Sequence, residues 1–91
     1  MIKKIVSIVI PNWNGAGVIT DCLTSIKKQS VKPHEIIVVD NGSIDDSAKI
    51  IKSKFPDVKL IQLEKNIGFA GGVNVGIKEA KGDYVFLLNN D

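Results

Sequence analysis

The chain has 91 residues, of which 44% are hydrophobic and 24% are charged, and its formal net charge at pH 7 is +2. These values are typical of a globular protein with one domain at most, and the charge is too small to indicate a nucleic-acid partner. All 12 basic residues are lysines, which excludes a bidentate arginine contact to phosphate from within this chain.

Cys22 is the only cysteine, so an intramolecular disulfide is excluded. It falls within an apolar helical pattern, and we expect a buried structural thiol rather than a nucleophile. The apolar run from Ile5 to Ile10 is shorter than the roughly 7–15 residues of the apolar region of a secretory signal peptide. No segment approaches the roughly 20 apolar residues of a membrane span. We therefore expect a cytoplasmic protein without a transmembrane segment, either soluble or membrane-peripheral in its full-length form.

The first predicted strand covers residues 5–10 and is rich in β-branched side chains, as strands buried on both faces are. Pro11 is expected to end it. Residues 18–28 carry their apolar side chains on one helical face, which predicts the first helix. The next apolar run, residues 36–39, predicts a second strand.

The second helix is expected to begin at the S-x-x-D sequence from Ser43 to Asp46, which has the form of a capping box. Ile44 would lie on the inward face of this helix. Pro56 is expected to end it, and residues 58–63 predict a third strand.

A third helix is predicted over residues 69–80, with Phe69, Val73 and Ile77 on its inward face. Residues 84–88 predict a fourth, buried strand. The alternation of strands and helices predicts an α/β fold: a parallel Rossmann-like sheet of about four strands with helices on both faces.

Polar residues follow each of the four predicted strands. In open α/β sheets, ligands bind just beyond the carboxyl ends of the strands. One polar strand end is ordinary turn chemistry, but four that converge predict a ligand crevice. The polar segments are residues 12–14, 40–43, 64–66 and 89–91.

Several of these residues could bind a nucleotide or a metal. Trp13 could stack on a flat heterocycle or cap the core. Asp40 could accept hydrogen bonds from a ribose or a base, or could form an Asx turn. The glycine-rich residues 68–76 could let a backbone approach phosphate, or could serve close helix–sheet packing. Asp91 with Asn89 could bind Mg²⁺ or Mn²⁺ when substrate phosphates complete the shell.

Together, four blocks resemble the nucleotide-binding half of family-2 glycosyltransferases, which have the GT-A fold. The resemblance covers nearly the whole chain and implies the N-terminal half of that fold, with residues 1–91 as one nucleotide-sugar-binding half-domain truncated before the acceptor-binding half. The blocks are VSIVIPNWN (6–14), EIIVVDNGS (35–43), EKNIGFAGGVNVG (64–76) and GDYVFLLNND (82–91).

The resemblance implies a role for each block. Trp13 would stack on uracil or thymine, Asp40 would accept from the base N3–H, and residues 68–74 would lie along the ribose and diphosphate. Residues 89–91 match the family's D-x-D-type metal motif, which implies a divalent metal, Mg or Mn. The implied nucleotide-sugar ligands are Pro11, Asn12, Trp13, Asn14, Asp40, Asn41, Asn66, Gly68, Gly72, Asn74 and Asn90, and the implied metal ligands are Asp91 and Asn89.

The resemblance also implies a UDP- or dTDP-linked donor sugar, and the Asn-Asn-Asp motif looks most like rhamnosyltransferase-type members of cell-surface polysaccharide biosynthesis. Two positions depart from the family: Asn89 replaces the first acidic residue, and Val73 stands where many relatives have arginine. The family's general base and acceptor site lie beyond position 91. We therefore expect these residues to bind a donor but not to transfer sugar alone.

Two other functions fit parts of the sequence. Gly15-Ala16-Gly17 after a strand, with Asp40 ending the next, suggests a dinucleotide-binding Rossmann domain, although Thr20 replaces the third glycine. A non-enzymatic flavodoxin-like module would show no nucleotide effect. The hydrophobic strand at residues 84–88 also predicts self-association through an open sheet edge.

Overall fold

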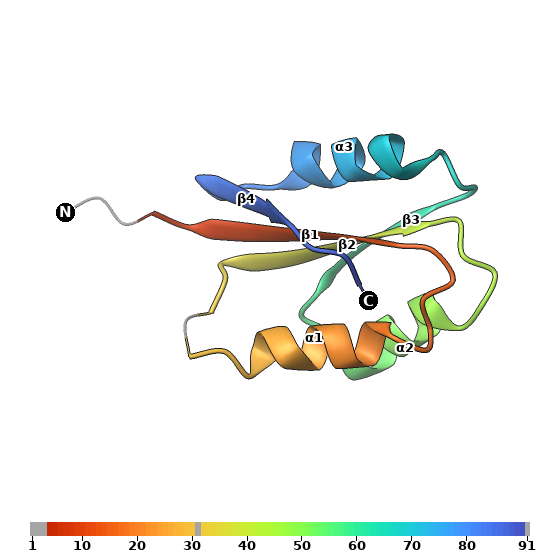
Figure 1. Ribbon diagram of the computed structural model, residues 1–91, viewed down its shortest axis with the longest axis horizontal. Coiled ribbons are helices and arrows are strands. Elements are labelled where there is room, and N and C mark those ends of the chain that lie inside the picture. Colours follow the sequence, from red (N-terminus) through yellow and green to blue (C-terminus); the bar gives the residue numbers. More distant parts are fainter. Residues whose placement is uncertain (1–3, 31, 91) are drawn as a thin grey trace.

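The computed structural model describes residues 4–30 and 32–90 (Figure 1). Strands and helices alternate along the described chain in the predicted order. The elements are β1 (Val6–Asn12), α1 (Ile19–Lys27), β2 (Glu35–Asn41), α2 (Ser47–Lys54), β3 (Lys59–Leu63), α3 (Phe69–Glu79) and β4 (Tyr84–Leu87).

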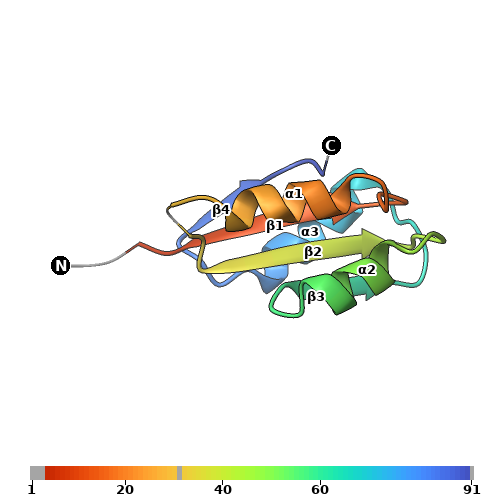
Figure 2. The same cartoon turned by 90° about the horizontal axis from the view of Figure 1, so that it is seen from below.

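The four strands form one parallel sheet in the order β3-β2-β1-β4. In the register, Ile10 of β1 lies opposite Val38 of β2, and Val9 lies opposite Leu87 of β4. Helices α1 and α2 cover one face of the sheet and α3 covers the other (Figures 1 and 2). The predicted α/β architecture, with helices on both faces of a four-stranded parallel sheet, is confirmed.

The core has two parts because the central strands are buried on both faces. Ile10 and Val38 face α1 and α2, whereas Val9, Ile37 and Val39 form the smaller cluster on the α3 side. Each of these five side chains is fully buried. The continuous β-branched runs of the two central strands are therefore explained by a sheet that is covered on both sides.

Strand β1 runs through Pro11 to Asn12, so the prediction that Pro11 ends it was wrong. The main chain of Val9 bonds toward β4, because its carbonyl accepts from the N–H of Leu88 at 3.0 Å. Pro11, two residues later, faces the same side of β1, at a position beyond the last residue of β4. The N–H that proline lacks would therefore have had no partner within that strand. The proline therefore removes no ladder hydrogen bond, and the strand carries Asn12 to the sheet edge.

The predicted capping box of α2 is also wrong. The helix begins at Ser47, and the carboxylate of Asp45 accepts the Ser47 N–H and, from another loop, the Ala16 N–H, both at 3.0 Å. Desolvation raises the pKa of Asp45, but the hydrogen bonds from the Ser47 hydroxyl and from the N–H groups of Ala16 and Ser47 outweigh it and leave the pKa below its usual value. Ile44 is exposed, not inward, because the helix starts three residues after it.

The predicted inward face of α3 is wrong at two positions. Phe69 is 60% exposed and Ile77 is 47% exposed, whereas Gly72, Val73 and Gly76 are the buried residues. The helix rests on the sheet through its glycines, whose lack of a side chain lets the backbone approach the strands closely. Sheet contact is therefore made by the smallest residues of the helix.

Strand β4 is an exposed edge strand rather than the buried strand that was predicted. All four of its residues are exposed, as is Leu88 after it. The strand pairs only with β1, and the helices on the two faces extend over the other strands (Figure 2). Its apolar side chains and its outer backbone groups are thus accessible.

At the amino ends of the strands, one hydrogen-bonded cluster fixes the connection between α3 and β4. Ser7 is buried; its hydroxyl donates to the carboxylate of Glu35 and accepts from the N–H of Gly82 at 2.8 Å. The N–H of Lys81 donates to the same carboxylate. Desolvation raises the pKa of Glu35, but hydrogen bonds from Lys81 and Ser7 outweigh it and lower the pKa below the ordinary 4.5.

We expect Glu35→Gln to lower the free energy of unfolding by about 1–2 kcal/mol at pH 7, because two hydrogen bonds to a charged group are weakened. A lowered pKa in the folded state means that the stabilisation is present above the unfolded-state pKa. It is lost as the pH falls through the folded-state value. Urea unfolding of both proteins at pH 7 and pH 3 measures this, and an equal difference at the two pH values would contradict it.

Candidate functional site

A cleft of about 450 Å³ opens at the carboxyl ends of β1, β2 and β4. It lies where the four predicted polar segments converge, with the start of α3 as a further boundary. The lining side chains among residues 4–30 and 32–90 are uncharged. They are Pro11, Asn12, Trp13, Asn41, Asn66, Phe69, Asn89 and Asn90.

Asn12 connects the three strand ends beneath this cleft. Its side chain is 1% exposed; its Nδ2 donates to Oδ1 of Asp40 at 3.0 Å, and its Oδ1 accepts from Nδ2 of Asn90 at 2.7 Å. Asp40, which is 3% exposed, also accepts from the hydroxyl of Ser43. Asn12 therefore fixes the segment after β4 to the buried carboxyl group at the end of β2.

Asn41 holds the glycine-rich segment in a similar way. Its Nδ2 donates to the carbonyl of Gly68 and its Oδ1 accepts from the N–H of Ile67, both at 2.9 Å. The Nδ2 atom lies 3.0 Å from where a side-chain carbon on Gly72 would be. Both polar ends of Asn41 are used by the protein, which makes it the anchor between β2 and α3.

The loop after β1 is tied to the loop after β2 by Asn14 and Ser43. The N–H of Asn14 donates to the hydroxyl of Ser43 at 2.8 Å, and the Asn14 side chain accepts from the N–H of Ile44 at 2.9 Å. Asn14 takes a φ of 51°, a left-handed conformation that asparagine tolerates better than most residues. These bonds set the position of Trp13, which is 58% exposed on the cleft.

The structure brings most of the predicted site residues together. Seven of the cleft's lining residues were predicted, and Asp40, Asn14 and Gly68 are hydrogen-bonded directly behind them or beside them. Asn74 is exposed on α3 and is not among the lining residues. Asp91 lies outside the described residues, so its predicted position beside Trp13 and Asp40 stays a prediction.

Two residues of the site were not predicted individually, although the segments 40–43 and 68–74 that contain them were. Phe69 lines the cleft although helical periodicity had assigned it to the core. Ser43 bridges Asp40 and Asn14, whereas its sequence pattern had suggested a helix cap. The available signal was the place of Ser43 in the polar segment 40–43, which follows the second predicted strand.

The donor set at this edge fits only one kind of metal site. The part of the chain that the structure describes contains no group of three or more His, Cys, Asp or Glu side chains that could hold a metal. Asn89, whose side chain carries an amide oxygen, lines the cleft, and Asp91 follows two residues later in the sequence. Mg²⁺ and Mn²⁺ can be bound by as few as one or two protein side chains when substrate phosphates and water complete the coordination shell. The residues therefore fit a metal that arrives with a diphosphate.

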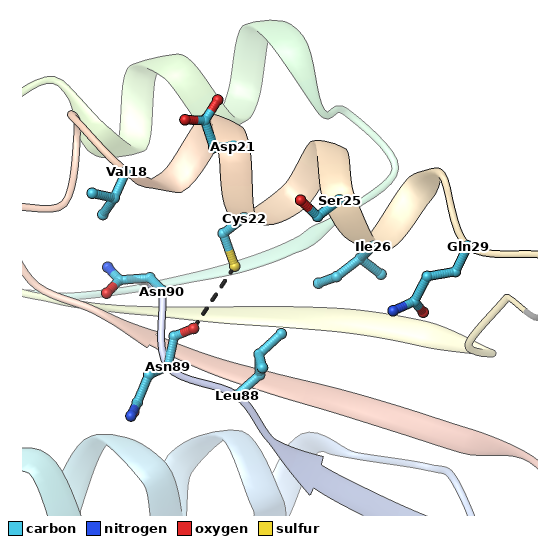
Figure 3. A pocket seen from close by; sticks show the side chains of 9 residues that line it. All are labelled: Val18, Asp21, Cys22, Ser25, Ile26, Gln29, Leu88, Asn89 and Asn90. Atoms are coloured by element: carbon cyan, nitrogen blue, oxygen red, sulfur yellow. Dashed lines mark hydrogen bonds between the residues drawn. The ribbon is translucent and has the colours of Figure 1, made fainter.

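A second groove, of about 500 Å³, lies between α1 and the segment after β4 (Figure 3). Cys22 is half-buried in it, not fully buried as predicted, because it faces this open side of α1. Its thiol points toward the carbonyl oxygen of Asn89, 4.0 Å away (Figure 3). Burial raises the pKa of the Cys22 thiol, which agrees with the prediction that it is not a nucleophile.

The geometry around Gly15 disfavours a dinucleotide fingerprint. A side-chain carbon at Gly15 would lie 2.2 Å from Oδ1 of Asn12 and 2.4 Å from Nδ2 of Asn90. The space that a pyrophosphate would need beside this glycine is therefore filled by protein side chains. Six residues also separate β1 from α1, so the tight strand-to-helix turn of that motif is absent.

Among the described residues, no helix has both the length and the apolar character needed to cross a membrane.

Comparison with known proteins identifies relatives over almost the whole chain. A family model described as glycosyl transferase family 2 matches residues 7–91. The uncharacterized glycosyltransferase YwdF of Bacillus subtilis is 36% identical over 88 residues, which are 94% of this chain and 32% of that protein. The poly(ribitol-phosphate) beta-glucosyltransferase of Bacillus spizizenii is 38% identical over 92 residues, covering 94% of this chain and 14% of its own length. The chain thus spans about a third or less of these relatives.

Solved structures that share the fold include two glycosyltransferase complexes. TarS 1-349 of S. aureus in complex with UDP-GlcNAc superposes with a TM-score of 0.86 and 32% identity, over 96% of this chain and 26% of that chain. The mannosyltransferase PcManGT of Pyrobaculum calidifontis, in complex with GDP-Man and Mn²⁺, has a TM-score of 0.84 and 26% identity, over 99% of this chain and 28% of its own. Both agree with the four-stranded parallel sheet and three helices described above.

Proposed function

This chain belongs to glycosyl transferase family 2, and we propose that residues 1–91 form the nucleotide-sugar-binding half-domain of a glycosyltransferase. One observation carries the proposal: a cleft lies at the carboxyl edge of the sheet, with Trp13 on its surface and polar strand ends around it. The complexes of TarS with UDP-GlcNAc and of PcManGT with GDP-Man support a nucleotide sugar as the ligand.

Within this proposal, Trp13 stacks on the base and Asp40 accepts from the base N3–H beneath the cleft. The Asn66 and Gly68 segment lies along the ribose and diphosphate, since Asn41 fixes it at the cleft. The buried Asn12 and Asn41 act by positioning these groups, because their amides bond to other parts of the protein. We assign no catalytic base to residues 1–91.

The proposed metal is Mg²⁺ or Mn²⁺, held by Asp91 and Asn89 together with the diphosphate; the Mn²⁺ of the PcManGT complex supports this choice. When bound, such an ion stabilises the negative charge of the departing diphosphate. Because none of the described lining residues is cationic and the chain has no arginine, the metal would supply positive charge next to the phosphates.

The donor and the cellular setting are proposed from the relatives. We propose a UDP- or dTDP-linked donor, with a rhamnosyl group favoured by the Asn-Asn-Asp motif at 89–91. Relatives named for teichoic acid and poly-N-acetylglucosamine synthesis support a role in cell-surface polysaccharide assembly. We further propose that the protein acts on the cytoplasmic side of the membrane. Self-association through the exposed edge of β4 remains part of the proposal.

The proposal predicts that UDP with Mn²⁺ quenches the fluorescence of Trp13, the only tryptophan. Trp13→Ala is expected to weaken UDP binding, measured by titration calorimetry, by about tenfold, because a base-stacking contact is lost. Mn²⁺ alone is expected to give no measurable heat, since the protein supplies too few ligands without a diphosphate.

NADH serves as the control ligand in the same titration. A dinucleotide-binding domain would respond to NADH and not to UDP with Mn²⁺, and a flavodoxin-like module would respond to neither. Either result would refute the proposed function.

A further inference from the structure

The start of α3 extends past the end of the sheet. A side-chain carbon at Gly76 would lie 2.4 Å from Val9 and 3.0 Å from Val39, in the middle of the sheet. At Gly72, one turn earlier, the nearest side chain is already that of Asn41, the last residue of β2. With a rise of about 1.5 Å per residue, Phe69 stands a further 4–5 Å along the helix and therefore beyond the strand end.

This overhang explains why Phe69 is exposed. Its position in the helical repeat matches the face that packs on the sheet, but no strand remains beneath it. It lines the cleft instead, together with Asn66 and Asn41. Leaving an aromatic ring 60% exposed forgoes about 1–2 kcal/mol of burial, so the position is one where a ligand could supply the missing contact.

Most polar side chains of the cleft are already hydrogen-bonded within the protein, so the aromatic rings are the main surfaces left to contact a ligand. Both ends of the Asn12 and Asn41 side chains bond within the protein, and Asn66 accepts from the N–H of Gly68 at 2.7 Å. No charged side chain is found among the lining residues that the structure describes. The largest exposed surfaces that remain are the rings of Trp13 and Phe69.

We propose that Phe69 is a second ring contact for the nucleobase, facing it from the α3 side of the cleft while Trp13 contacts it from the β1 side. This inference rests on the proposed function, since it assigns a contact to the same ligand. The cleft then selects a flat, uncharged ring by aromatic contact on two sides, and the phosphates lie outside this pair.

The experiment is calorimetric titration of the chain with UDP and with UMP, each with Mn²⁺. Phe69→Ala and Phe69→Leu are each expected to weaken the binding of both ligands by about tenfold, because both remove the ring. Leucine keeps most of the apolar volume, so its effect isolates the ring contact. Phe69→Tyr is expected to bind as the unmodified chain does. The matched control is Ile77→Ala, which removes another exposed apolar side chain of α3 two turns away and should leave both affinities unchanged.

Titration with pyrophosphate and Mn²⁺ separates a ring contact from a phosphate contact. If Phe69 contacts the base, its variants bind pyrophosphate as the unmodified chain does; an equal loss for pyrophosphate and UDP would overturn the inference. Unchanged UDP affinity in Phe69→Ala and Phe69→Leu would overturn it as well, while leaving the proposed function intact. Absence of UDP binding by the unmodified chain would refute the proposed function and this inference with it.

Discussion

Asn12→Ala is expected to lower the free energy of unfolding by about 3 kcal/mol, one of the two largest effects that we predict for a single substitution. The buried carboxyl group of Asp40 would lose its 3.0 Å hydrogen bond, and the amide of Asn90 would lose its 2.7 Å acceptor. A hydrogen bond to a buried charged group is worth about 1.5–3 kcal/mol, and an unpaired buried partner adds its own desolvation cost. Urea unfolding followed by circular dichroism measures the change.

The matched control for this variant is Asn74→Ala, the same amide deletion at an exposed position of α3. Alanine is a better helix former than asparagine, so the control should be neutral or stabilised by a few tenths of a kcal/mol. If the two variants lost similar stability, the hydrogen bonds of Asn12 would not hold the strand ends together. Asn12→Ala also tests the positioning role of Asn12, because UDP binding by this variant should weaken even at temperatures where the protein stays folded.

Gly76→Ala is expected to lower the free energy of unfolding by about 2 kcal/mol. The added methyl carbon would lie 2.4 Å from the side chain of Val9 and 3.0 Å from that of Val39, both fully buried and stiff at χ1. Overpacking of this kind costs about 1–3 kcal/mol, occasionally more, whereas the gain in helix propensity is only about 1 kcal/mol. At so short a contact we expect the steric term to prevail, with α3 displaced from the sheet.

Gly17→Ala provides the control, because a side-chain carbon there would have no atom within 4 Å. Its stability should change by less than about 0.5 kcal/mol. Thermal unfolding of both variants distinguishes the two environments. A Gly76→Ala variant as stable as the unmodified protein would show that α3 can move away from the sheet at little cost.

The two variants would affect the site differently. Asn12 bonds directly to Asp40 and Asn90, so its loss should disturb the cleft even where the sheet persists. Gly76 is two turns from the first residue of α3, and a shift of the helix there would also move Phe69. Measuring UDP affinity beside stability therefore tests whether the cleft depends on the helix as well as on the strand ends.

The pattern of the sequence was sufficient to predict the order of the elements, the parallel sheet and the edge that carries the site. Continuous β-branched runs such as residues 36–39 indicate strands buried on both faces, and the rules of strand connection leave few arrangements for such a chain. Since the carboxyl ends of parallel strands share one edge, polar residues after each strand had to come together. These inferences depend on local composition and general topology alone.

Other features depended on what each residue meets in space. The inward face of α3 was predicted from periodicity, which places Phe69 beside Val73 but does not show where the sheet ends beneath the helix. The cap of α2 was assigned to Ser43, yet that hydroxyl bonds to Asp40 and Asn14, which lies 29 residues away in the chain. Cys22 lies on an apolar helical face, but it is half-buried because a groove separates this part of α1 from the segment after β4.

The sequence by itself determined that this protein is an α/β chain with its polar strand ends gathered at one edge, because hydrophobic period and chain connectivity are properties of the sequence. The tertiary structure alone decided which of those residues bond to each other and which remain free for a ligand. Asn12 and Asn41 are fixed by partners about 26 to 78 positions away. Hydrogen-bond partners and exposed rings are set by packing across the fold, which no local pattern records.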